Sequence, residues 1–124
     1  MTIKVLAIDD SRTIRSLVQK VMEEAGFECL LADDGVQGVA RFHEDRPDVV
    51  ITDINMPNMD GYGVISAIRS GSVHCNVPIL VLTTESAPHL KAKARDAGAT
   101  GWIVKPFDDV AIVSVVRRVT GARA

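Results

Sequence analysis

A chain of 124 residues is the length of one ordinary globular domain, and its 47% apolar and 24% charged residues exclude a disordered chain. The formal net charge of −2 offers no basic face for nucleic acid, and the amino terminus is neither a signal peptide nor a membrane span. The two cysteines, Cys29 and Cys75, suggest reduced thiols rather than a disulfide framework. We therefore expect one cytoplasmic, monomeric domain over residues 1–124, with no affinity for nucleic acid or membrane.

The first predicted strand and helix flank an acidic pair. An apolar run over residues 3–8 ends at Asp9-Asp10, and Ser11 is placed to cap a helix that ends at Gly26. The apolar residues of this helix recur with the i, i+3, i+4, i+7 spacing of one inward face. They are Ile14, Leu17, Val18, Val21 and Met22.

The second strand is predicted over residues 27–32. Asp34-Gly35 then starts a helix that must end before Pro47, because a residue preceding proline disfavours helical geometry. The residues predicted to face inward on this helix are Val36, Val39 and Ala40.

The central strand is a short β-branched run, residues 49–52, that ends abruptly in the carboxylate of Asp53. Proline, asparagine and glycine in the next residues mark a loop. A third helix follows over residues 61–69. Its predicted inward residues are Val64, Ile65 and Ile68.

Two prolines introduce the next strand and helix. Pro78 precedes an apolar strand over residues 79–82 that ends in Thr83, and Pro88 suits the first turn of a fourth helix. The inward stripe of this helix is thin. It consists of Leu90, Ala94 and Ala97.

The last strand is predicted over residues 99–104 and ends in Lys105. Asp108-Asp109 opens the final helix, where negative charge is favourable at the positive end of the helix dipole. Its inward residues are predicted to be Val113, Val116 and Val119.

Strand and helix alternate five times, which predicts an α/β, doubly wound parallel sheet with helices on both faces. The first, third, fourth and fifth strands end in Asp9-Asp10, Asp53, Thr83 and Lys105, and strand two contributes no such group. The flavodoxin-like strand order 2-1-3-4-5 accounts for this, because it places strand two at an edge. We expect one sheet edge to gather Asp9, Asp10, Asp53, Thr83 and Lys105.

Three carboxylates packed together repel, so they must share protons or hold a divalent cation. Oxygen ligands at an open loop favour Mg²⁺. The Asp53 carboxylate can attack phosphorus to form an acyl phosphate, while the Lys105 ammonium and the Thr83 hydroxyl balance the charge of the phosphoryl oxygens.

These residues, in this order and spacing, resemble the signature of the receiver domain of two-component response regulators. The matching residues are Asp9-Asp10, Asp53, Met56-Pro57, Asp60-Gly61, Thr83 and Lys105-Pro106-Phe107. The resemblance implies that Asp53 accepts a phosphoryl group from the phosphohistidine of a histidine kinase. It implies that Asp10 and Asp53 bind Mg²⁺ by side chain, Asn55 by its backbone carbonyl and Asp9 through water, and that Lys105-Pro106 is a cis peptide.

The resemblance also implies a switch. Phosphorylation draws the Thr83 hydroxyl towards the phosphoryl group, and an aromatic ring on the fifth strand, here Trp102, enters the space. The family more often has tyrosine, phenylalanine or histidine at that position, and the larger indole puts full inward rotation in question. Asn55 and Glu85 occupy positions at which the family tunes dephosphorylation.

Within this family, residues 83–86 and 97–107 resemble the single-domain chemotaxis regulators of the CheY type. That likeness implies no attached output domain, and a phosphorylated form that binds the flagellar motor switch or a phosphatase. It implies no enzyme activity beyond phosphorylation and dephosphorylation of the chain itself. A phosphate sink and a phosphorelay intermediate are the alternatives.

Rivals from other classes are weaker. A haloacid-dehalogenase-like phosphatase needs a second aspartate two residues after its nucleophile, where this chain has Asn55. A flavodoxin-like electron carrier needs a phosphate loop rich in serine, threonine and glycine after Ile8, and none is present. His43, His74 and His89 lack metal-like spacing and are predicted to lie at the surface.

Overall fold

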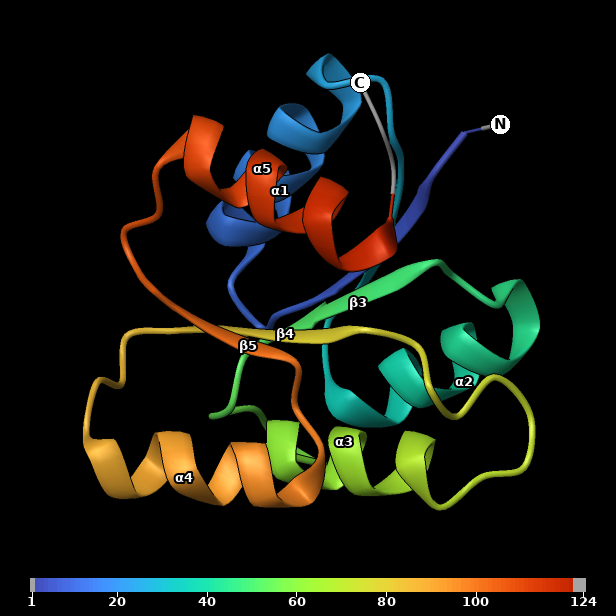
Figure 1. Cartoon of the computed structure of the whole chain (residues 1–124), viewed down its shortest axis with the longest axis vertical. Helices are drawn as coiled ribbons and strands as arrows, with labels where there is room; N and C mark the ends of the chain where they lie inside the picture. The colour runs from blue at the N-terminus through green and yellow to red at the C-terminus, as the bar shows by residue number, and fades with distance from the viewer. Residues whose placement is uncertain (1, 122–124) are drawn as a thin grey trace.

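Strands and helices alternate along the whole described chain, residues 2–121, in the computed structural model. Figure 1 shows how these elements are arranged. They are β1 (Lys4–Ile8), α1 (Arg12–Glu24), β2 (Glu28–Ala32), α2 (Gly35–Asp45), β3 (Val49–Thr52), α3 (Gly61–Arg69), β4 (Ile79–Thr83), α4 (Pro88–Ala97), β5 (Gly101–Val104) and α5 (Asp109–Thr120). The end of the chain at residues 122–124 lies outside the described part.

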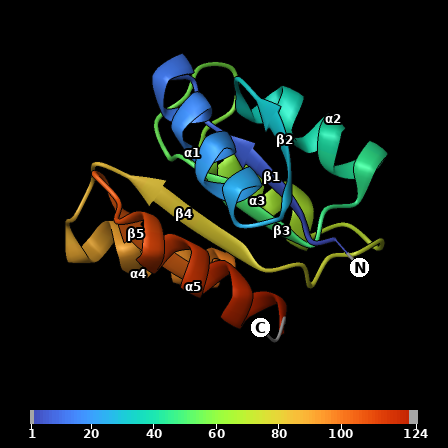
Figure 2. The same cartoon turned by 90° about the horizontal axis from the view of Figure 1, so that it is seen from above.

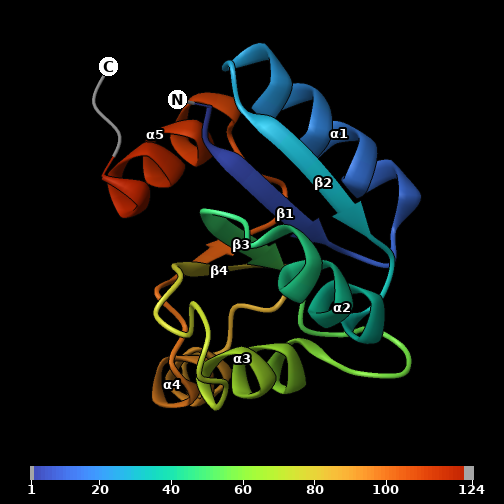
Figure 3. The ribbon, with the colours of Figure 1, turned by 90° about the vertical axis from the view of Figure 1, so that its right-hand side faces the viewer.

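The five strands form one parallel sheet in the order β2-β1-β3-β4-β5, as predicted. Helices α1 and α5 cover one face, and α2, α3 and α4 cover the other (Figures 1 and 3). This is the flavodoxin-like fold. The register pairs Ile8 of β1 with Thr52 of β3, so the residues that follow these two strands emerge side by side.

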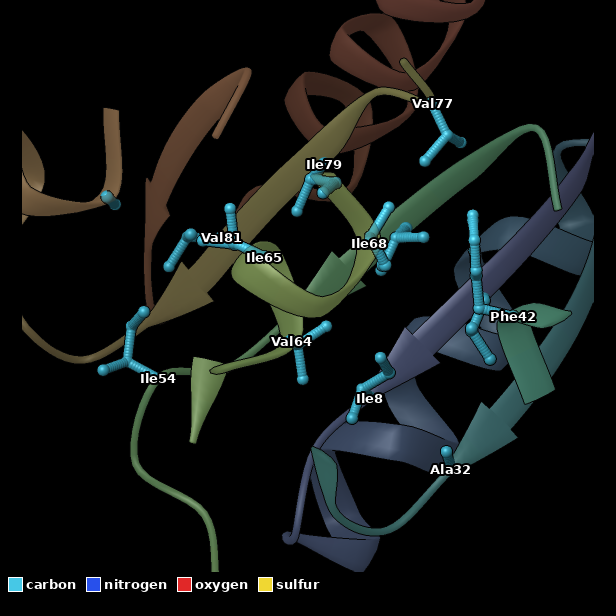
Figure 4. Close-up of a cluster of buried hydrophobic side chains, with 13 residues drawn as sticks. Ile8, Ala32, Phe42, Ile54, Val64, Ile65, Ile68, Val77, Ile79 and Val81 are labelled. Atoms are coloured by element: carbon cyan, nitrogen blue, oxygen red, sulfur yellow. The ribbon is translucent and has the colours of Figure 1, made fainter. Parts of the chain in front are cut away.

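Successive side chains of each strand point to opposite faces and therefore fill two separate cores. Leu6, Ile8 and Val81 join the core beneath α2, α3 and α4, where Val64, Ile65 and Ile68 of α3 are fully buried as predicted (Figure 4). The other core lies beneath α1 and α5. It contains Val5, Ala7, Val18, Met22, Val49, Ile51, Leu80, Leu82, Ile112 and Val116.

The inward face of α1 is narrower than the sequence pattern predicted. Val18 and Met22 are buried, but Leu17 is 46% exposed, so its prediction was wrong. One residue corresponds to about 100° around a helix, and Leu17 therefore lies at the border of the stripe centred on Val18. The predicted cap is correct, since the Ser11 hydroxyl accepts a hydrogen bond from the Ile14 amide.

The inward face of α2 was predicted correctly only at Val39, which packs against the core beneath α2, α3 and α4. Val36 is 51% exposed and Ala40 is also exposed, whereas Gly35, Gly38 and Phe42 are the buried residues. A Cβ atom at Gly38 would collide with the side chain of Ile8, so the missing side chain lets α2 approach β1 closely. Phe42 then fills the space further along the helix (Figure 4).

The last two helices are packed unequally. Of the thin stripe predicted for α4, Ala94 is fully buried and Ala97 packs at the margin of the core, whereas Leu90 is only partly buried. In α5, Val116 is buried as predicted, and Ile112 is a buried residue that the prediction missed. The predicted Val113 and Val119 pack at the margin of the same core.

Candidate functional site

The polar residues predicted to gather at one sheet edge do so. The Asp9 amide donates to the Ala32 carbonyl (3.1 Å) and the Asp53 amide donates to the Ile8 carbonyl (2.9 Å). These bonds extend the parallel ladder by one residue beyond β1 and β3. Each carboxylate therefore starts from a backbone position that the sheet holds fixed, at the carboxyl edge where open α/β sheets bind ligands. Figure 2 views the same sheet and helices from above.

Asp9 is buried and fully engaged. Its Oδ1 accepts a hydrogen bond from the Ser11 amide (2.9 Å), and its Oδ2 accepts one from Lys105 Nζ (2.8 Å). The backbone carbonyl of Asp9 accepts a hydrogen bond from an Arg15 guanidinium nitrogen (2.6 Å). Arg15 was not predicted from the sequence, because a charged residue within a helix pattern gives no signal that its side chain reaches back to the turn before the helix.

Asp53 is also buried, with 8% of its surface exposed. Its Oδ1 accepts a hydrogen bond from the Ile54 amide (2.7 Å), and its Oδ2 lies 3.1 Å from Lys105 Nζ. A Cβ atom at position 61 would collide with the Asp53 carbonyl, so Gly61 allows the loop to return close to the strand end. The Gly61 amide closes the loop by donating to the Ile54 carbonyl (2.8 Å).

The Lys105 ammonium forms ion pairs with both buried carboxylates of this site, Asp9 and Asp53. Burial opposes its charged form, but hydrogen bonds to Asp9 and Asp53 outweigh burial and raise the pKa of the Lys105 ammonium. Burial raises the pKa of the Asp9 carboxyl, although the Lys105 hydrogen bond and the Ser11 amide act in the opposite direction. Lys105 therefore remains a cation at neutral pH and holds two carboxylates together.

Asp9, Asp10 and Asp53 offer carboxylate oxygens that lie within 4.8 Å of one another. Asp10 is exposed while the other two are buried, so the cluster opens towards solvent on one side. A set of oxygen ligands with an open side fits Mg²⁺, which retains several waters when bound. The Asn55 carbonyl as a further ligand stays a prediction.

The backbone of Glu85 lies between the two predicted switch residues. The Glu85 amide donates to Thr83 Oγ1 (3.3 Å), and the Glu85 carbonyl accepts a hydrogen bond from Trp102 Nε1 (3.0 Å). Thr83 is buried, and the Trp102 ring packs at the margin of the core beneath α3 and α4. The Asn55 amide donates to Glu85 Oε1 (3.3 Å), which brings the two predicted tuning residues into contact.

The backbone at the carboxyl end of β5 is held in place by a hydrogen bond to β4. The Lys105 amide donates to the Thr83 carbonyl (2.8 Å), so β4 and β5 still pair at this level. The Lys105–Pro106 peptide bond is cis.

A second contact that the sequence analysis missed holds the loop after Asp53. Asn58 Nδ2 donates to Asp34 Oδ2 (2.7 Å), while Asp34 Oδ1 caps α2 by accepting from the Gln37 amide. Asn58 has a left-handed backbone (φ 69°), a conformation that asparagine adopts more readily than most residues. That preference was the available signal. The hydrogen bonds from Gln37 and Asn58 lower the pKa of the Asp34 carboxyl.

The remaining polar candidates lie away from this site. His43, His74 and His89 are exposed, as predicted. One ring nitrogen of His74 contacts the Pro47 carbonyl (2.7 Å), which lies just before the amino-terminal end of β3. Cys29 and Cys75 are both free thiols. Among residues 2–121, no helix is both long enough and apolar enough to cross a bilayer.

The chain matches known receivers over nearly its whole length. The model of the response regulator receiver domain matches residues 5–117. The chemotaxis protein CheY4 of Vibrio cholerae superposes with a TM-score of 0.91 and 42% identity, over 96% of this chain and 99% of that one. Protein PilG of Pseudomonas aeruginosa is 30% identical over 115 residues, which cover 93% of this chain and 85% of PilG.

Other relatives are longer. A probable transcriptional regulator, ycf27 of Guillardia theta, is 37% identical over 116 residues, but this chain spans 44% of its length. By its fold, its carboxylate and lysine cluster and this match, the chain belongs to the response regulator receiver domain family.

Proposed function

We propose that this chain is a chemotaxis-type response regulator, which accepts a phosphoryl group on Asp53 from a histidine kinase and then binds a partner through the α4, β5 and α5 surface. The observation that carries the proposal is the position of Lys105. One ammonium reaches both Asp9 (2.8 Å) and Asp53 (3.1 Å), across the point where the phosphoryl group would be received.

The proposed reaction is a direct transfer. A carboxylate oxygen of Asp53 forms a bond to phosphorus as the bond between phosphorus and the kinase histidine nitrogen breaks, and the bonding electrons leave with the imidazole. Mg²⁺ held by Asp10 and Asp53, and by Asp9 through water, would neutralise the carboxylates and one phosphoryl oxygen. Lys105 then pairs with a second oxygen. The chain catalyses no reaction other than its own phosphorylation and dephosphorylation.

The proposed response starts at Thr83. A phosphoryl oxygen on Asp53 would attract the Thr83 hydroxyl, which now accepts a hydrogen bond from the Glu85 amide (3.3 Å). Because the Glu85 carbonyl holds the Trp102 indole (3.0 Å), movement of Thr83 is transmitted to β5. Phosphorylation then shifts the population of two arrangements of this surface rather than building a new one.

The similarity to CheY4, a chemotaxis protein, at 42% identity over nearly both chains supports a role in chemotaxis. The partner we propose is a flagellar motor-switch protein. A phosphate sink and a relay intermediate share every residue of the site and differ only in what the surface binds. The alternative that this chain is itself a haloacid-dehalogenase-like phosphatase needs an acidic group at position 55. Asn55 instead donates a hydrogen bond from its side-chain amide to Glu85.

The test is binding to the amino-terminal segment of a flagellar motor-switch protein, measured in Mg²⁺ with and without beryllium fluoride as a phosphoryl mimic. Fluorescence of Trp102, the sole tryptophan, reports in the same sample whether the mimic has changed the surface. Tighter binding with the mimic is the expected result. A fluorescence change without tighter binding would favour a sink or a relay.

A further inference from the structure

Helix α4 is held mainly by a neighbouring helix. Ala94 is its one fully buried residue, and its backbone approaches α3 more extensively than it approaches β4 or β5. Its first turn begins at Ala87, which supplies no side-chain cap, whereas the other four helices each begin with a capping serine or aspartate. Figure 1 shows α4 and α3 side by side beneath the sheet.

Two side chains of α3 attach α4, one near each end. Tyr62 donates its hydroxyl to the Leu90 carbonyl in the first turn of α4 (3.2 Å), and Arg69 Nε donates to the Gly98 carbonyl at the end of α4 (3.0 Å). Tyr62 and Arg69 are seven residues apart, which is about 10 Å along a helix. Leu90 and Gly98 are eight apart, about 12 Å, so the two contacts match in spacing.

The contact at Arg69 is the firmer of the two. A second guanidinium nitrogen donates to the Cys75 carbonyl (2.6 Å), so one side chain joins the end of α4 to the loop before β4. Gly98 has a left-handed backbone (φ 113°), and a Cβ atom there would lie 3.0 Å from the Arg69 side chain. Charged hydrogen bonds are stronger than neutral ones, and this pair leaves little freedom at the end of α4.

The contact at Tyr62 is weaker and partly exposed. It consists of one neutral hydrogen bond and the Lys93 ammonium, which lies 4.1 Å from the centre of the Tyr62 ring. Burial, together with the charges of Asp60 and Glu85, raises the pKa of Tyr62, so the phenol keeps the proton it donates.

A groove of about 230 Å³ separates α4 from β5 on the other side of the helix. It is lined in part by Ala94, Ala99, Gly101 and Trp102. Lys91 and Ala94 line the groove from α4, so the middle of the helix has room to move relative to Trp102, while the contact with Arg69 fixes the end of α4.

We infer that Tyr62 is a releasable latch and Arg69 a fixed pivot, so that α4 swings about its Arg69-held end when the Tyr62–Leu90 hydrogen bond opens. This inference rests on the proposed function for the role of the α4 and β5 surface. The latch sets the resting position of α4, and loosening it makes the activated arrangement easier to reach.

Amide hydrogen exchange of the unmodified protein tests the latch without any partner or phosphoryl mimic. Tyr62→Phe removes the hydroxyl and keeps the ring, so amides in the first two turns of α4 should exchange about two- to tenfold faster. Amides of α1 should be unchanged. Arg69→Met should instead accelerate exchange at Gly98 and Ala99. Equal exchange in Tyr62→Phe and the wild type overturns the inference, as does uniform acceleration across all helices.

A matched pair of lysine variants separates the ring contact from the loss of charge. Lys93→Ala removes the cation over Tyr62, and Lys91→Ala removes the same charge from an exposed neighbouring position of α4. Faster exchange near Leu90 is expected in Lys93→Ala alone. The same acceleration in both variants would count against the latch.

Titration with beryllium fluoride in Mg²⁺, followed by Trp102 fluorescence, tests the consequence for activation. Tyr62→Phe should lower the concentration of mimic at half-response by about two- to tenfold, and Lys20→Ala, which removes one charge from an exposed position of α1, should leave it unchanged. An unchanged midpoint despite faster exchange would refute the regulatory role of the latch. If the wild type itself does not respond, the proposed function fails, and the exchange data still decide whether the latch exists.

Discussion

The centre of the sheet and its β5 edge differ sharply in packing. Every residue of β3 and β4 is buried, and α3 above them buries Val64, Ile65 and Ile68, whereas no residue of β5 is fully buried and α4 buries Ala94 alone. Asp53 belongs to the centre and Trp102 to the edge. A phosphoacceptor needs fixed geometry, while a responsive surface needs two arrangements of similar free energy, and weakly packed elements supply them.

Replacing Asp53 with asparagine should have the largest effect, because it removes the phosphoacceptor at the centre of the sheet. The amide removes the nucleophilic carboxylate, so phosphorylation from a kinase or a small phosphodonor is expected to be lost entirely. The fold should persist, because the ladder bond from the Asp53 amide to the Ile8 carbonyl does not involve the side chain. Mass spectrometry and circular dichroism report the two properties, and acid-labile phosphate on the variant would rule out Asp53 as the acceptor.

Lys105→Met should uncouple the β5 edge of the sheet from phosphorylation of Asp53 at its centre. The variant keeps Asp53, so much of the phosphorylation is expected to remain, but the cation that joins the centre to the end of β5 is gone. Trp102 fluorescence should then respond weakly to beryllium fluoride. Lys105→Arg, which retains the charge, is the control. A full fluorescence response in Lys105→Met would mean that the edge senses phosphorylation by another route.

Truncating one isoleucine in each region measures the packing difference directly. Ile79→Ala in the fully buried β4 should lower the free energy of unfolding by about 2–5 kcal/mol. Ile103→Ala in the partly buried β5 should cost roughly half as much or less. Urea denaturation of both variants provides the comparison, and equal losses would show that the edge is packed as tightly as the centre.

The smallest effect concerns the opposite edge of the sheet, where Cys29 of β2 is 7% exposed. Burial, with a smaller effect from Glu23, raises the pKa of the Cys29 thiol from 9.0 to about 12. The folded state therefore holds its proton where the unfolded state loses it, so stability is unaffected below pH 9 and falls as the pH rises towards 12. The loss attributable to this thiol is at most about 1.4 kcal/mol at pH 10.

Urea denaturation of the wild type and Cys29→Ala at pH 8 and pH 10 isolates that contribution, because lysines and tyrosine titrate alike in both proteins. A smaller pH dependence is expected in the variant. Identical dependence would indicate that β2 admits solvent, and that an edge position by itself loosens a strand.

The strand order and the polar residues at the sheet edge were predictable because both depend on patterns along the chain. Short apolar runs that end in Asp9, Asp53, Thr83 or Lys105 specify their own carboxyl ends. The errors arose where packing distance mattered. Gly35, Gly38 and Phe42 have the i, i+3, i+7 spacing of an inward face, yet a pattern read from apolar side chains alone selected Val36 and Ala40.

Hydrogen bonds from side chains to the backbone of another segment were also not predictable from the sequence. Arg15 to the Asp9 carbonyl and Tyr62 to the Leu90 carbonyl depend on the reach and direction of single side chains between elements. Hydropathy and spacing carry no information about such directions. Such contacts depend on how the helices pack over the sheet.

The position of Lys105 has a consequence for the charge of the carboxylate cluster. Asp9, Asp10 and Asp53 carry three negative charges against one ammonium, which leaves two uncompensated. One divalent cation would bring the cluster to neutrality. An acyl phosphate carries about two charges in place of the single charge of a carboxylate, so it would leave the cluster one charge short again. Lys105 already sits among these groups, and phosphorylation would therefore become an electrostatic pull on the end of the least buried strand.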